Sequence, residues 1–244
     1  MIALMISKRL QTIAQYCPKG SRVADIGSDH ALLASYLLVS GIASYVIAGE
    51  LNEGPYQAAR RQIHTLQARD RASVRKGNGL AVLAPGEAEV ICIAGMGGQL
   101  IVSILTEGKE KLPGVRRLIL QPNVGEELVR RWLIDNGWQL THETILEEDQ
   151  IIYEILVAEP GDPLVPYRDK DKTTEELIRI GPLLWTEKSP VLRRKWERER
   201  DKWLNVLAQV KRSDRPETAQ RVKEIEAELA WMNEVIRCLH TDRR

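Results

Sequence analysis

Five residues with chemical potential follow the first long apolar stretch of the chain. They stand in the segment VADIGSDHALL and are Asp25, Gly27, Ser28, Asp29 and His30. A glycine lets the backbone approach a ligand closely, and the positive amino end of a following helix suits a carboxylate or phosphate. Ser28 or Asp29 could cap that helix. The segment therefore predicts a cofactor loop in which an acid and a histidine could also handle protons.

Polar residues also end the next two apolar stretches. Glu50 ends YVIAGE, 23 residues after Gly27, and Asn78 stands in KGNGL. An acid at the end of a second strand accepts hydrogen bonds from two ribose hydroxyls, which fits NAD and S-adenosylmethionine (SAM) alike. We expect Glu50 to bind a ribose and Asn78 to bond the edge of an adenine. The alternatives are a solvated strand end at Glu50 and a plain turn at Asn78.

The spacing of glycines separates these two cofactors. The first loop lacks GxGxxG, whose glycines bring a helix end close to a pyrophosphate. SAM has no phosphate, and its amino-acid end needs backbone donors and an acid for its ammonium group. A GxG does occur at Gly95-Met96-Gly97, but the following stretch, RLILQPN, ends in an amide and a proline. The residues favour SAM, with an NAD-linked oxidoreductase as the second hypothesis.

Alternating elements must position these residues. Apolar runs that predict buried strands alternate with helical patterns, at residues 22–26, 45–49, 73–75, 90–94 and 117–121. This alternation predicts an α/β fold with a parallel sheet and helices on both faces. Two further strand-like runs, at 138–159, predict a terminal antiparallel hairpin that turns at Glu147, Glu148 and Asp149. By analogy, this is the Rossmann-like order of class I SAM methyltransferases.

The pattern changes after residue 160. EPGDPLVPY (159–167) holds three prolines and a glycine, which is typical of a linker. Beyond it, apolar spacings of three and four predict an antiparallel helical hairpin of coiled-coil type, joined by residues 211–216. The expected seam comprises Leu192, Trp196, Trp203, Val206, Val210, Val222, Ile225, Leu229, Met232, Ile236 and Leu239. We expect two domains, residues 1–160 and residues 161–244.

Composition argues against several classes of protein. The chain has 244 residues and three widely separated cysteines without CxxC pairing. This favours reduced thiols in a cytoplasmic protein over a disulfide framework or a zinc site. No run approaches the roughly 18 apolar residues of a membrane span. Lys8 and Arg9 follow the apolar start, which is the wrong order for a signal peptide. We expect a cytoplasmic monomer without a metal ion.

Several segments together resemble one known family. In order they are SKRLQTIAQYCPKGSRVADIGSDHALL, AGELNEGPYQAA, GNGL, IAGMGGQLI, LILQPN and DQIIYEILVAE, from about Ser7 to Glu159. With them, the chain resembles the bacterial tRNA (adenine-22-N1)-methyltransferase family, often called TrmK. The resemblance implies a class I SAM-dependent methyltransferase domain, a C-terminal coiled-coil domain, and transfer of a methyl group from SAM to N1 of adenine-22 in tRNA.

The resemblance also implies roles for individual residues. The first SAM loop would comprise Asp25, Gly27, Ser28, Asp29 and His30. The ribose would lie against Glu50 and Leu51, and the adenine against Asn78 and Gly79. The wall near the methyl group would comprise Gly95, Met96, Gly97 and Gly98, with Ala94 beside it, and the target side would comprise Gln121, Pro122 and Asn123. Two departures are visible: Ala31-Leu32 stands where the family often has Ala-Tyr, and Asn78 where many methyltransferases have Asp.

The turn AGMGG (94–98) bears on which nitrogen is methylated. Enzymes that methylate exocyclic amines often carry an (N/D)PP(Y/F) turn here, but AGMGG offers no side-chain acceptor and no ring. A ring nitrogen such as adenine N1 already has a lone pair, so positioning and desolvation could supply most of the rate. A tight turn of small residues is the structural alternative.

Four residues are the candidates for catalysis: Asp29, His30, Met96 and Asn123. Asp29 would stabilise the cationic product or take a proton from N6. His30 would bond the carboxylate of SAM or a tRNA phosphate, and Met96 would pack against the base. Asn123 would line the target side. The alternative is that Asp29 caps the helix and His30 only packs.

The C-terminal region has a basic character that fits tRNA. Residues 168–244 carry a net charge of +4, and the rest of the chain −3. Arg193, Arg194 and Lys195 could hold phosphates, or they could form an ordinary solvated face. The helical spacing of the nearby tryptophans favours core positions. A noncatalytic SAM- or RNA-binding module, with the helical hairpin as an interaction arm, is the third hypothesis.

Overall fold

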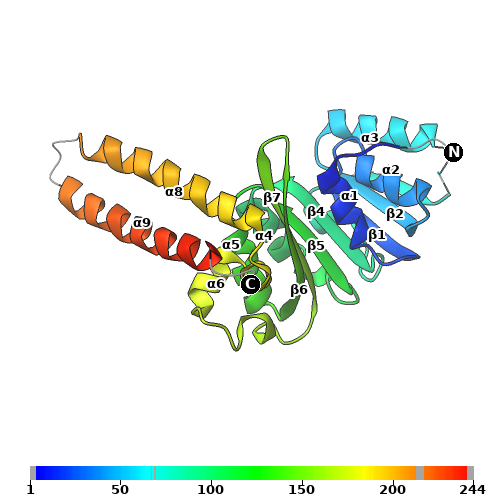
Figure 1. Ribbon diagram of the computed structural model, residues 1–244. Coiled ribbons are helices and arrows are strands. Elements are labelled where there is room, and N and C mark those ends of the chain that lie inside the picture. The colour runs from blue at the N-terminus through cyan, green and yellow to red at the C-terminus, as the bar shows by residue number, and fades with distance from the viewer. Residues whose placement is uncertain (1–3, 67, 69, 213–216, 241–244) are drawn as a thin grey trace. The chain divides into compact units, whose positions relative to one another are not determined.

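The chain folds into two compact units (Figure 1). The computed structural model describes residues 4–66, 68, 70–212 and 217–240. Residues 1–183 belong to one unit, called here the sheet unit, and residues 184–244 belong to the other, called the helical unit.

A seven-stranded sheet forms the centre of the sheet unit, in the order β3-β2-β1-β4-β5-β7-β6. β1 to β5 run parallel, and β7 pairs antiparallel with β5 and β6. The bounds are β1 Ser21–Ile26, β2 Ala43–Glu50, β3 Ala72–Lys76, β4 Val90–Met96, β5 Arg117–Pro122, β6 Trp138–Glu148 and β7 Ile151–Pro160. The predicted α/β fold, with a parallel sheet closed by a hairpin, is confirmed.

Helices cover both faces of this sheet (Figure 1). On one face lie α1 (Lys8–Gln15), α2 (Leu32–Val39) and α3 (Glu53–Thr65). On the other lie α4 (Gly98–Glu107), α5 (Glu126–Asp135) and the short turn η1 (Gly79–Val82). Neighbouring residues of β4 point to opposite faces, so Ile91 is buried in one core and Cys92 in the other. The short turn η2 (Lys109–Lys111) precedes β5.

The turn of the β6–β7 hairpin is shorter than predicted. Glu147 and Glu148 still belong to β6, where Glu148 pairs with Ile151. Only Asp149 and Gln150 form the turn, and their φ angles are +50° and +66°. Two residues with positive φ are typical of a type I′ turn, whose twist matches that of the flanking strands.

The division between the units falls later than the boundary expected at residue 160. η3 (Val165–Tyr167) and α6 (Thr174–Ile180) belong to the sheet unit. Arg131 of α5 pairs with Glu175 at 2.6 Å, and the carbonyl of Ile178 accepts a hydrogen bond from Arg130. Proline-rich composition predicted the linker, but not that the chain beyond it returns to pack on α5.

The helical unit contains an antiparallel hairpin of α8 (Pro190–Val210) and α9 (Thr218–His240), preceded by α7 (Pro182–Glu187), which spans the division. Ser189 caps α8 through a bond from the N–H of Leu192. Trp196 packs edge-on against Trp231, with ring centroids 5.0 Å apart. The seam differs from the expected one at Val206, which is 39% exposed, whereas Leu207 is half-buried. Of the predicted joint, residues 213–216 lie outside the described residues.

Candidate active site

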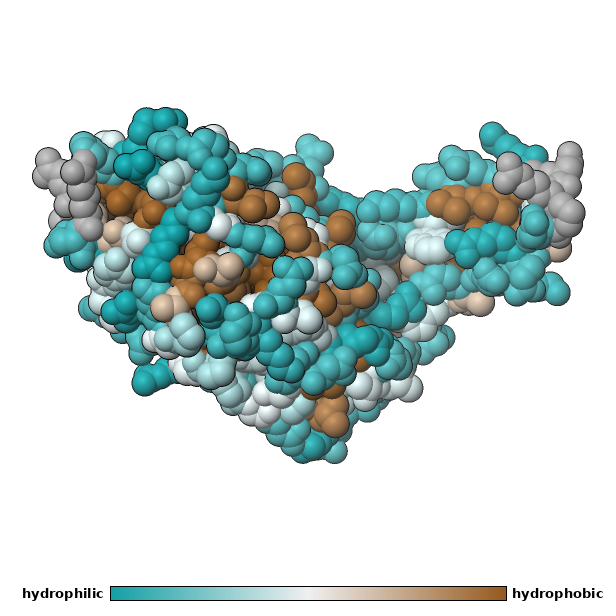
Figure 2. All heavy atoms as spheres, turned by 180° about the vertical axis from the view of Figure 1, so that it is seen from behind, coloured by the Kyte–Doolittle hydropathy of each residue, from teal (hydrophilic) through white to brown (hydrophobic). Residues whose placement is uncertain are grey.

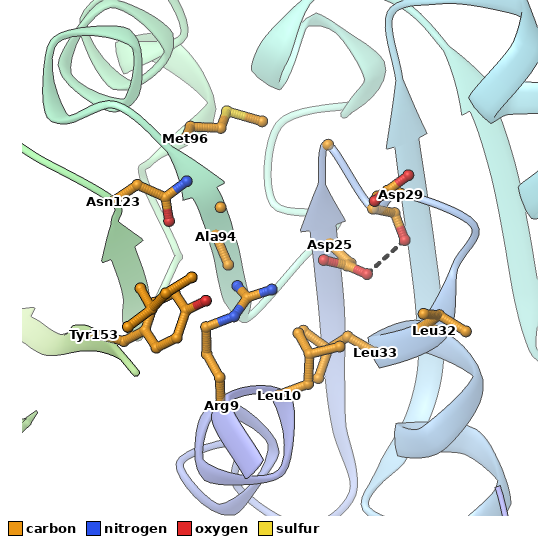
Figure 3. Close-up of a pocket in the computed structure, with 14 residues that line it drawn as sticks. Arg9, Leu10, Asp25, Asp29, Leu32, Leu33, Ala94, Met96, Asn123 and Tyr153 are labelled. Carbon is orange, nitrogen blue, oxygen red and sulfur yellow. Dashed lines mark hydrogen bonds between the residues drawn. The ribbon is translucent and has the colours of Figure 1, made fainter. Parts of the chain in front are cut away.

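A cavity of about 630 Å³ opens at the carboxyl edge of the sheet, between the ends of β1 and β4 (Figure 3). It is lined by Arg9, Leu10, Asp25, Gly27, Ser28, Asp29, Leu32, Leu33, Ala94, Gly95, Met96, Asn123, Ile151 and Tyr153. All these residues belong to the sheet unit. Ligands of open parallel sheets bind at this edge, where neighbouring strands send their helices to opposite faces.

The loop after β1 is tied to the neighbouring strand. The N–H of Gly27 donates to the carbonyl of Gly49 at 2.9 Å. The hydroxyl of Ser28 donates to Oδ2 of Asp25 at 2.5 Å, so Ser28 turns inward and does not cap α2. The residue at the amino end of α2 is Ala31, which makes no side-chain cap. The expectation that Ser28 or Asp29 caps this helix is wrong.

The same loop is strained at three consecutive residues. The φ angles of Asp29, His30 and Ala31 are +37°, +64° and +55°, in the left-handed region that side chains with a Cβ avoid. Such conformations cost roughly 1–3 kcal/mol each and gather at functional sites. The side chains of Asp29 and His30 are 83% and 63% exposed, with Oδ1 and Nε2 3.5 Å apart. Asp29 lines the cavity and His30 does not.

Two buried carboxylates stand at the ends of β1 and β2. Asp25 is 4% exposed, and burial raises its pKa to about 6, although the Ser28 hydroxyl lowers it. Glu50 is 6% exposed, and burial raises its pKa as well. Among the described residues, Oε1 of Glu50 has no hydrogen-bond partner. Because a buried acceptor without a donor is costly, a ligand with an N–H or O–H group at Oε1 of Glu50 would remove that cost.

The residues predicted to surround the adenine lie at the ends of β2 and β3, outside the cavity lining. The two strand ends are joined, because the N–H of Gly77 donates to the carbonyl of Glu50 at 2.9 Å. Asn78 is exposed, and its Nδ2 lies 3.5 Å from Oε2 of Glu107. Leu51 is 57% exposed, and Gly79 begins η1 with φ at +51°.

The loops after β4 and β5 are joined by backbone hydrogen bonds. The N–H of Asn123 donates to the carbonyl of Met96, and that of Gly98 to the carbonyl of Val124, both at 2.7 Å. A Cβ on Gly98 would lie 2.1 Å from the carbonyl oxygen of Gly125, so only glycine fits there. Packing against the neighbouring loop therefore requires the last glycine of AGMGG, Gly98. A Cβ on Gly97 would meet nothing closer than 3.9 Å, which leaves that position open.

Apolar side chains reach the surface beside these loops. Val124 is 67% exposed and Leu100 is 52% exposed. Figure 2, seen from behind, shows apolar residues at the surface of the sheet unit. Met96 covers Gly27, since a Cβ on Gly27 would lie 2.0 Å from the terminal methyl of Met96. The mouth of the cavity therefore combines polar backbone with apolar side chains.

Six lining residues were not predicted, and two of them carry chemistry. Arg9 of α1 donates through Nη1 to Oε1 of Gln121 at 2.5 Å, and its guanidinium lies 5.3 Å from the ring centre of Tyr153. Figure 3 shows Arg9 and Tyr153 facing the same space as Asp25 and Asn123. The others are Leu10, Leu32, Leu33 and Ile151. Tyr153 comes from β7, a strand that the apolar pattern predicted only as part of the hairpin.

The remaining predicted residues lie behind the cavity or in the other unit. Gln121 and Pro122 are buried at the end of β5. Arg193 of α8 pairs with Glu197 at 3.0 Å, so part of the basic run is compensated within its own helix. Of the tryptophans, Trp185 and Trp196 are buried and Trp203 is half-buried, which agrees with core positions.

Neither a metal-binding cluster nor a membrane-spanning helix is found among the described residues. The described residues contain no group of three or more His, Cys, Asp or Glu side chains that could hold a metal ion. Across the same residues, no helix has the length and apolar character needed to cross a membrane. The three cysteines are free thiols, and Sγ of Cys17 and Sγ of Cys92 lie 3.9 Å apart in the core.

Comparison with known proteins agrees with this geometry. Residues 23–234 match the family model described as tRNA (adenine(22)-N(1))-methyltransferase. The chain is 44% identical to the tRNA (adenine(22)-N(1))-methyltransferase of Bacillus subtilis (strain 168), over 97% of this chain and 99% of the relative. The crystal structure of the B. subtilis m1A22 tRNA methyltransferase TrmK has a TM-score of 0.88 and covers 96% of this chain and 99% of that one.

A second solved structure contains a ligand. It is a Streptococcus pneumoniae protein in complex with S-adenosyl-L-methionine, 39% identical, with a TM-score of 0.83 over 95% of this chain and 100% of that one. The match to the family model spans most of the chain, including the ends of the strands that frame the cavity, all of α8, and α9 as far as residue 234. The chain belongs to the tRNA (adenine(22)-N(1))-methyltransferase family.

Proposed function

We propose that this chain transfers a methyl group from SAM to N1 of adenine-22 in tRNA. It is a SAM-dependent tRNA methyltransferase of the family that its sequence matches. The observation that carries the proposal is the pair of buried acids, Asp25 and Glu50, beside a β4–α4 turn without a side-chain acceptor. The acids suit the cofactor, and the turn suits a ring nitrogen that needs no base.

The residues present fit SAM better than NAD. Among the described residues, Oε1 of Glu50 is a buried acceptor without a donor, which a ribose hydroxyl of either cofactor would supply. Asp25 can accept a hydrogen bond from an ammonium group. Asp29 adds a third acid beside the same loop, and these charges would repel a pyrophosphate. When bound, SAM supplies a sulfonium methyl group, which N1 takes up as the S–C bond breaks.

The chain's own residues would position the base and stabilise its new charge. Met96 offers apolar contact in the lining of the cavity, and the exposed Val124 follows the lining residue Asn123 in the chain. N1 lies on the pairing edge of adenine, so the base must leave its stack before it can enter. Asp29 would face the positive charge that develops on the adenine ring, and His30 would bond a nearby anionic group.

Methyl incorporation into unmodified tRNA tests this function. We expect one methyl group per tRNA, at N1 of adenine-22, mapped by mass spectrometry of nuclease fragments. A transcript with guanine at position 22 is the control and should remain unmethylated. Asp29→Asn should lower turnover at least tenfold while the dissociation constant of SAM stays within about twofold. Methylation at another nucleotide, or unchanged turnover of Asp29→Asn, would contradict the respective assignment.

The basic run of α8, Arg193 to Lys195, is the segment that we propose binds tRNA phosphates. Neutralising Arg193, Arg194 and Lys195 with glutamine should weaken tRNA binding and flatten the plot of log affinity against log salt by about one unit per lost phosphate contact. The control changes Arg221 and Lys223 of α9 to glutamine, and the two sets are compared per charge removed. If both sets change the salt slope equally per charge, the run has no special role.

The remaining aspects of the proposal concern the working state of the enzyme. We propose a monomer that acts in the cytoplasm on tRNA and needs no metal ion, because an N1 lone pair attacks a methyl group without a Lewis acid. Activity should survive EDTA, and the mass in solution should correspond to one chain of 27.6 kDa.

A further inference from the structure

A buried amide lies beneath the target side of the cavity. Gln121 is fully buried at the end of β5. Its Oε1 accepts from the N–H of Gly95 at 3.1 Å and from Nη1 of Arg9 at 2.5 Å. Its Nε2 donates to the carbonyl of Pro122 at 2.9 Å and to Oδ1 of Asn123 at 3.0 Å. Every hydrogen-bonding position of this side chain is therefore used within the chain.

The partners leave only one orientation for this amide. A backbone N–H and a guanidinium can only donate, so the group facing Gly95 and Arg9 must be the oxygen of Gln121. Its nitrogen then faces Asn123, which must present Oδ1 in return. The chemistry of the neighbours thus fixes the orientation of two amides in sequence.

Asn123 is the exposed end of this arrangement. It lines the cavity, and its backbone N–H is held by the carbonyl of Met96 at 2.7 Å. Figure 3 shows its amide nitrogen directed toward the side of the cavity where Met96 lies. Within the described residues, Nδ2 makes no hydrogen bond, and Oδ1 retains a second lone pair. The side chain presents one donor beside one acceptor.

We propose that Asn123 reads the N6/N7 edge of the target adenine, an inference that rests on the proposed function. Nδ2 donates to N7, and Oδ1 accepts from the N6 amine. Asparagine recognises adenine by this pair of bonds in nucleic-acid complexes. A guanine would place its O6 against Oδ1, acceptor against acceptor, so Asn123 is a specificity-determining residue and Gln121 its positioning residue.

The N6/N7 edge is favoured because it leaves N1 free. A donor bonded to N1 would occupy the lone pair that must form the new N–C bond. Bonds to N6 and N7 hold the ring in plane while N1 stays available. The positive charge of Arg9 is held at Gln121 and over the ring of Tyr153, instead of facing the nitrogen that becomes cationic.

An atom replacement in the substrate tests the contact directly. Two tRNAs are compared, one with adenosine and one with 7-deazaadenosine at position 22, each with the unaltered enzyme and with Asn123→Ala. We expect kcat/KM of the unaltered enzyme to fall at least tenfold on the 7-deaza tRNA. On the adenosine tRNA, kcat/KM of Asn123→Ala should be at least tenfold below that of the unaltered enzyme. On the 7-deazaadenosine tRNA, kcat/KM of Asn123→Ala should be less than twofold below its own value on adenosine. The cycle cancels any change in the nucleophilicity of N1.

A second variant tests the positioning role of Gln121. Gln121→Glu places an acceptor opposite Asn123, so the Asn123 amide turns and offers oxygen where it offered nitrogen. The preference for N7 should disappear although Asn123 is intact, which a merely structural role would not cause. Asn136→Ala, which removes an amide bonded to the carbonyl of Trp132 in α5, should keep the full preference.

The outcomes separate this inference from the function beneath it. If neither tRNA gains a methyl group at N1, the proposed function fails. If N1 is methylated but the unaltered enzyme and Asn123→Ala lose the same factor on 7-deazaadenosine, the function stands and the reading of N7 is overturned. Retention of the N7 preference by Gln121→Glu would overturn the positioning role.

Discussion

Glu143 and Glu154 are buried in the sheet unit in ion pairs with one arginine, whereas Asp25 and Glu50 are buried there and form no ion pair among the described residues. Nε of Arg130 lies 2.7 Å from Oε1 of Glu143, and Nη2 lies 2.5 Å from Oε2 of Glu154. All three side chains are 0–1% exposed. Burial alone would lower the pKa of Arg130, but the two carboxylates raise it.

Arg130, Glu143 and Glu154, called here the Arg130 group, join three elements of the sheet unit. The group connects α5 to both strands of the hairpin, and the N–H of Leu183 donates to the second oxygen of Glu143 at 2.8 Å. Its charges are matched within the fold. Asp25 and Glu50 form no ion pair among the described residues, although Asp25 accepts a hydrogen bond from the hydroxyl of Ser28. One region uses buried charge to fix structure, and we propose that the other uses it to bind the ligand.

Removing Arg130 should have the largest effect on stability. Arg130→Met leaves two buried carboxylates without a cation, so we expect the free energy of unfolding to fall by about 3–5 kcal/mol in a urea titration. Arg131→Met, the next residue, removes an exposed pair with Glu175 and should cost less than about 1 kcal/mol. Equal losses in the two variants would show that the buried group is not the anchor inferred here.

The Arg130 group also shows what a sequence pattern can and cannot reveal. The strands, the crossover helices and the hairpin were predictable because apolar periodicity reports which faces are buried. Arg130 and Arg131 look alike in sequence, and only the packing of α5 separates them. One signal was present, since Glu154 interrupts the apolar run IIYEILVA. An acid inside a buried strand requires a partner, but the sequence does not name it.

The pocket was predictable in part for the same reason. Asp25 and Glu50 end predicted parallel strands, so the carboxyl edge brings them together. Arg9 and Tyr153 were missed because they reach the cavity from α1 and from β7, which are distant in sequence from the loops they complete. The caps expected at Ser28 or Asp29 failed because Ser28 bonds Asp25 instead. A local sequence motif does not show that a residue has a competing hydrogen-bond partner elsewhere in the fold.

The pH dependence of stability should show the second largest effect, through Asp25. Its pKa is about 6 in the folded chain and 3.8 as the unperturbed value, so the folded chain binds a proton more tightly than the unfolded one. Stability of the ligand-free protein should therefore fall as pH rises through this window, by about 3 kcal/mol in total. The affinity for SAM should rise over the same range, as the carboxylate forms.

Asp25→Asn isolates this contribution from the rest of the titration. The stability of Asp25→Asn relative to the unaltered protein should increase from pH 4.5 to 7.5, and its SAM affinity should be flat over that range. Glu87, outside the pocket, provides the opposite sign: Arg75 lowers its pKa to about 2, so its contribution is present above pH 4.5 and lost as pH falls. A constant stability difference between the two proteins would exclude a perturbed Asp25.

Glu50→Gln should separate affinity from stability. We expect the dissociation constant of SAM to rise about tenfold, because a neutral amide accepts hydrogen bonds from ribose hydroxyls less strongly. The ligand-free protein should become more stable, since a buried charge is removed. Glu143→Gln, in the Arg130 group, should do the reverse and lower stability without changing SAM affinity. Calorimetric titration and urea unfolding measure both quantities. If Glu50→Gln and Glu143→Gln both lowered stability, the inferred difference between the two pairs of buried acids would be wrong.

The smallest effect should come from strain in the loop. His30 has φ at +64° and an exposed side chain, so His30→Gly relieves strain without opening a cavity. We expect the free energy of unfolding of His30→Gly to be about 1 kcal/mol higher than that of His30→Ala, which also lacks the ring but keeps Cβ.

The turnover of His30→Ala then reports what the ring contributes to the reaction, and the further change in His30→Gly reports what the strained backbone contributes. If His30→Gly is more stable yet slower than His30→Ala, the strain serves the reaction. If the two variants are equally stable, the left-handed backbone carries no cost at His30. The difference between the pocket and the Arg130 group then lies only in how their buried acids are paired.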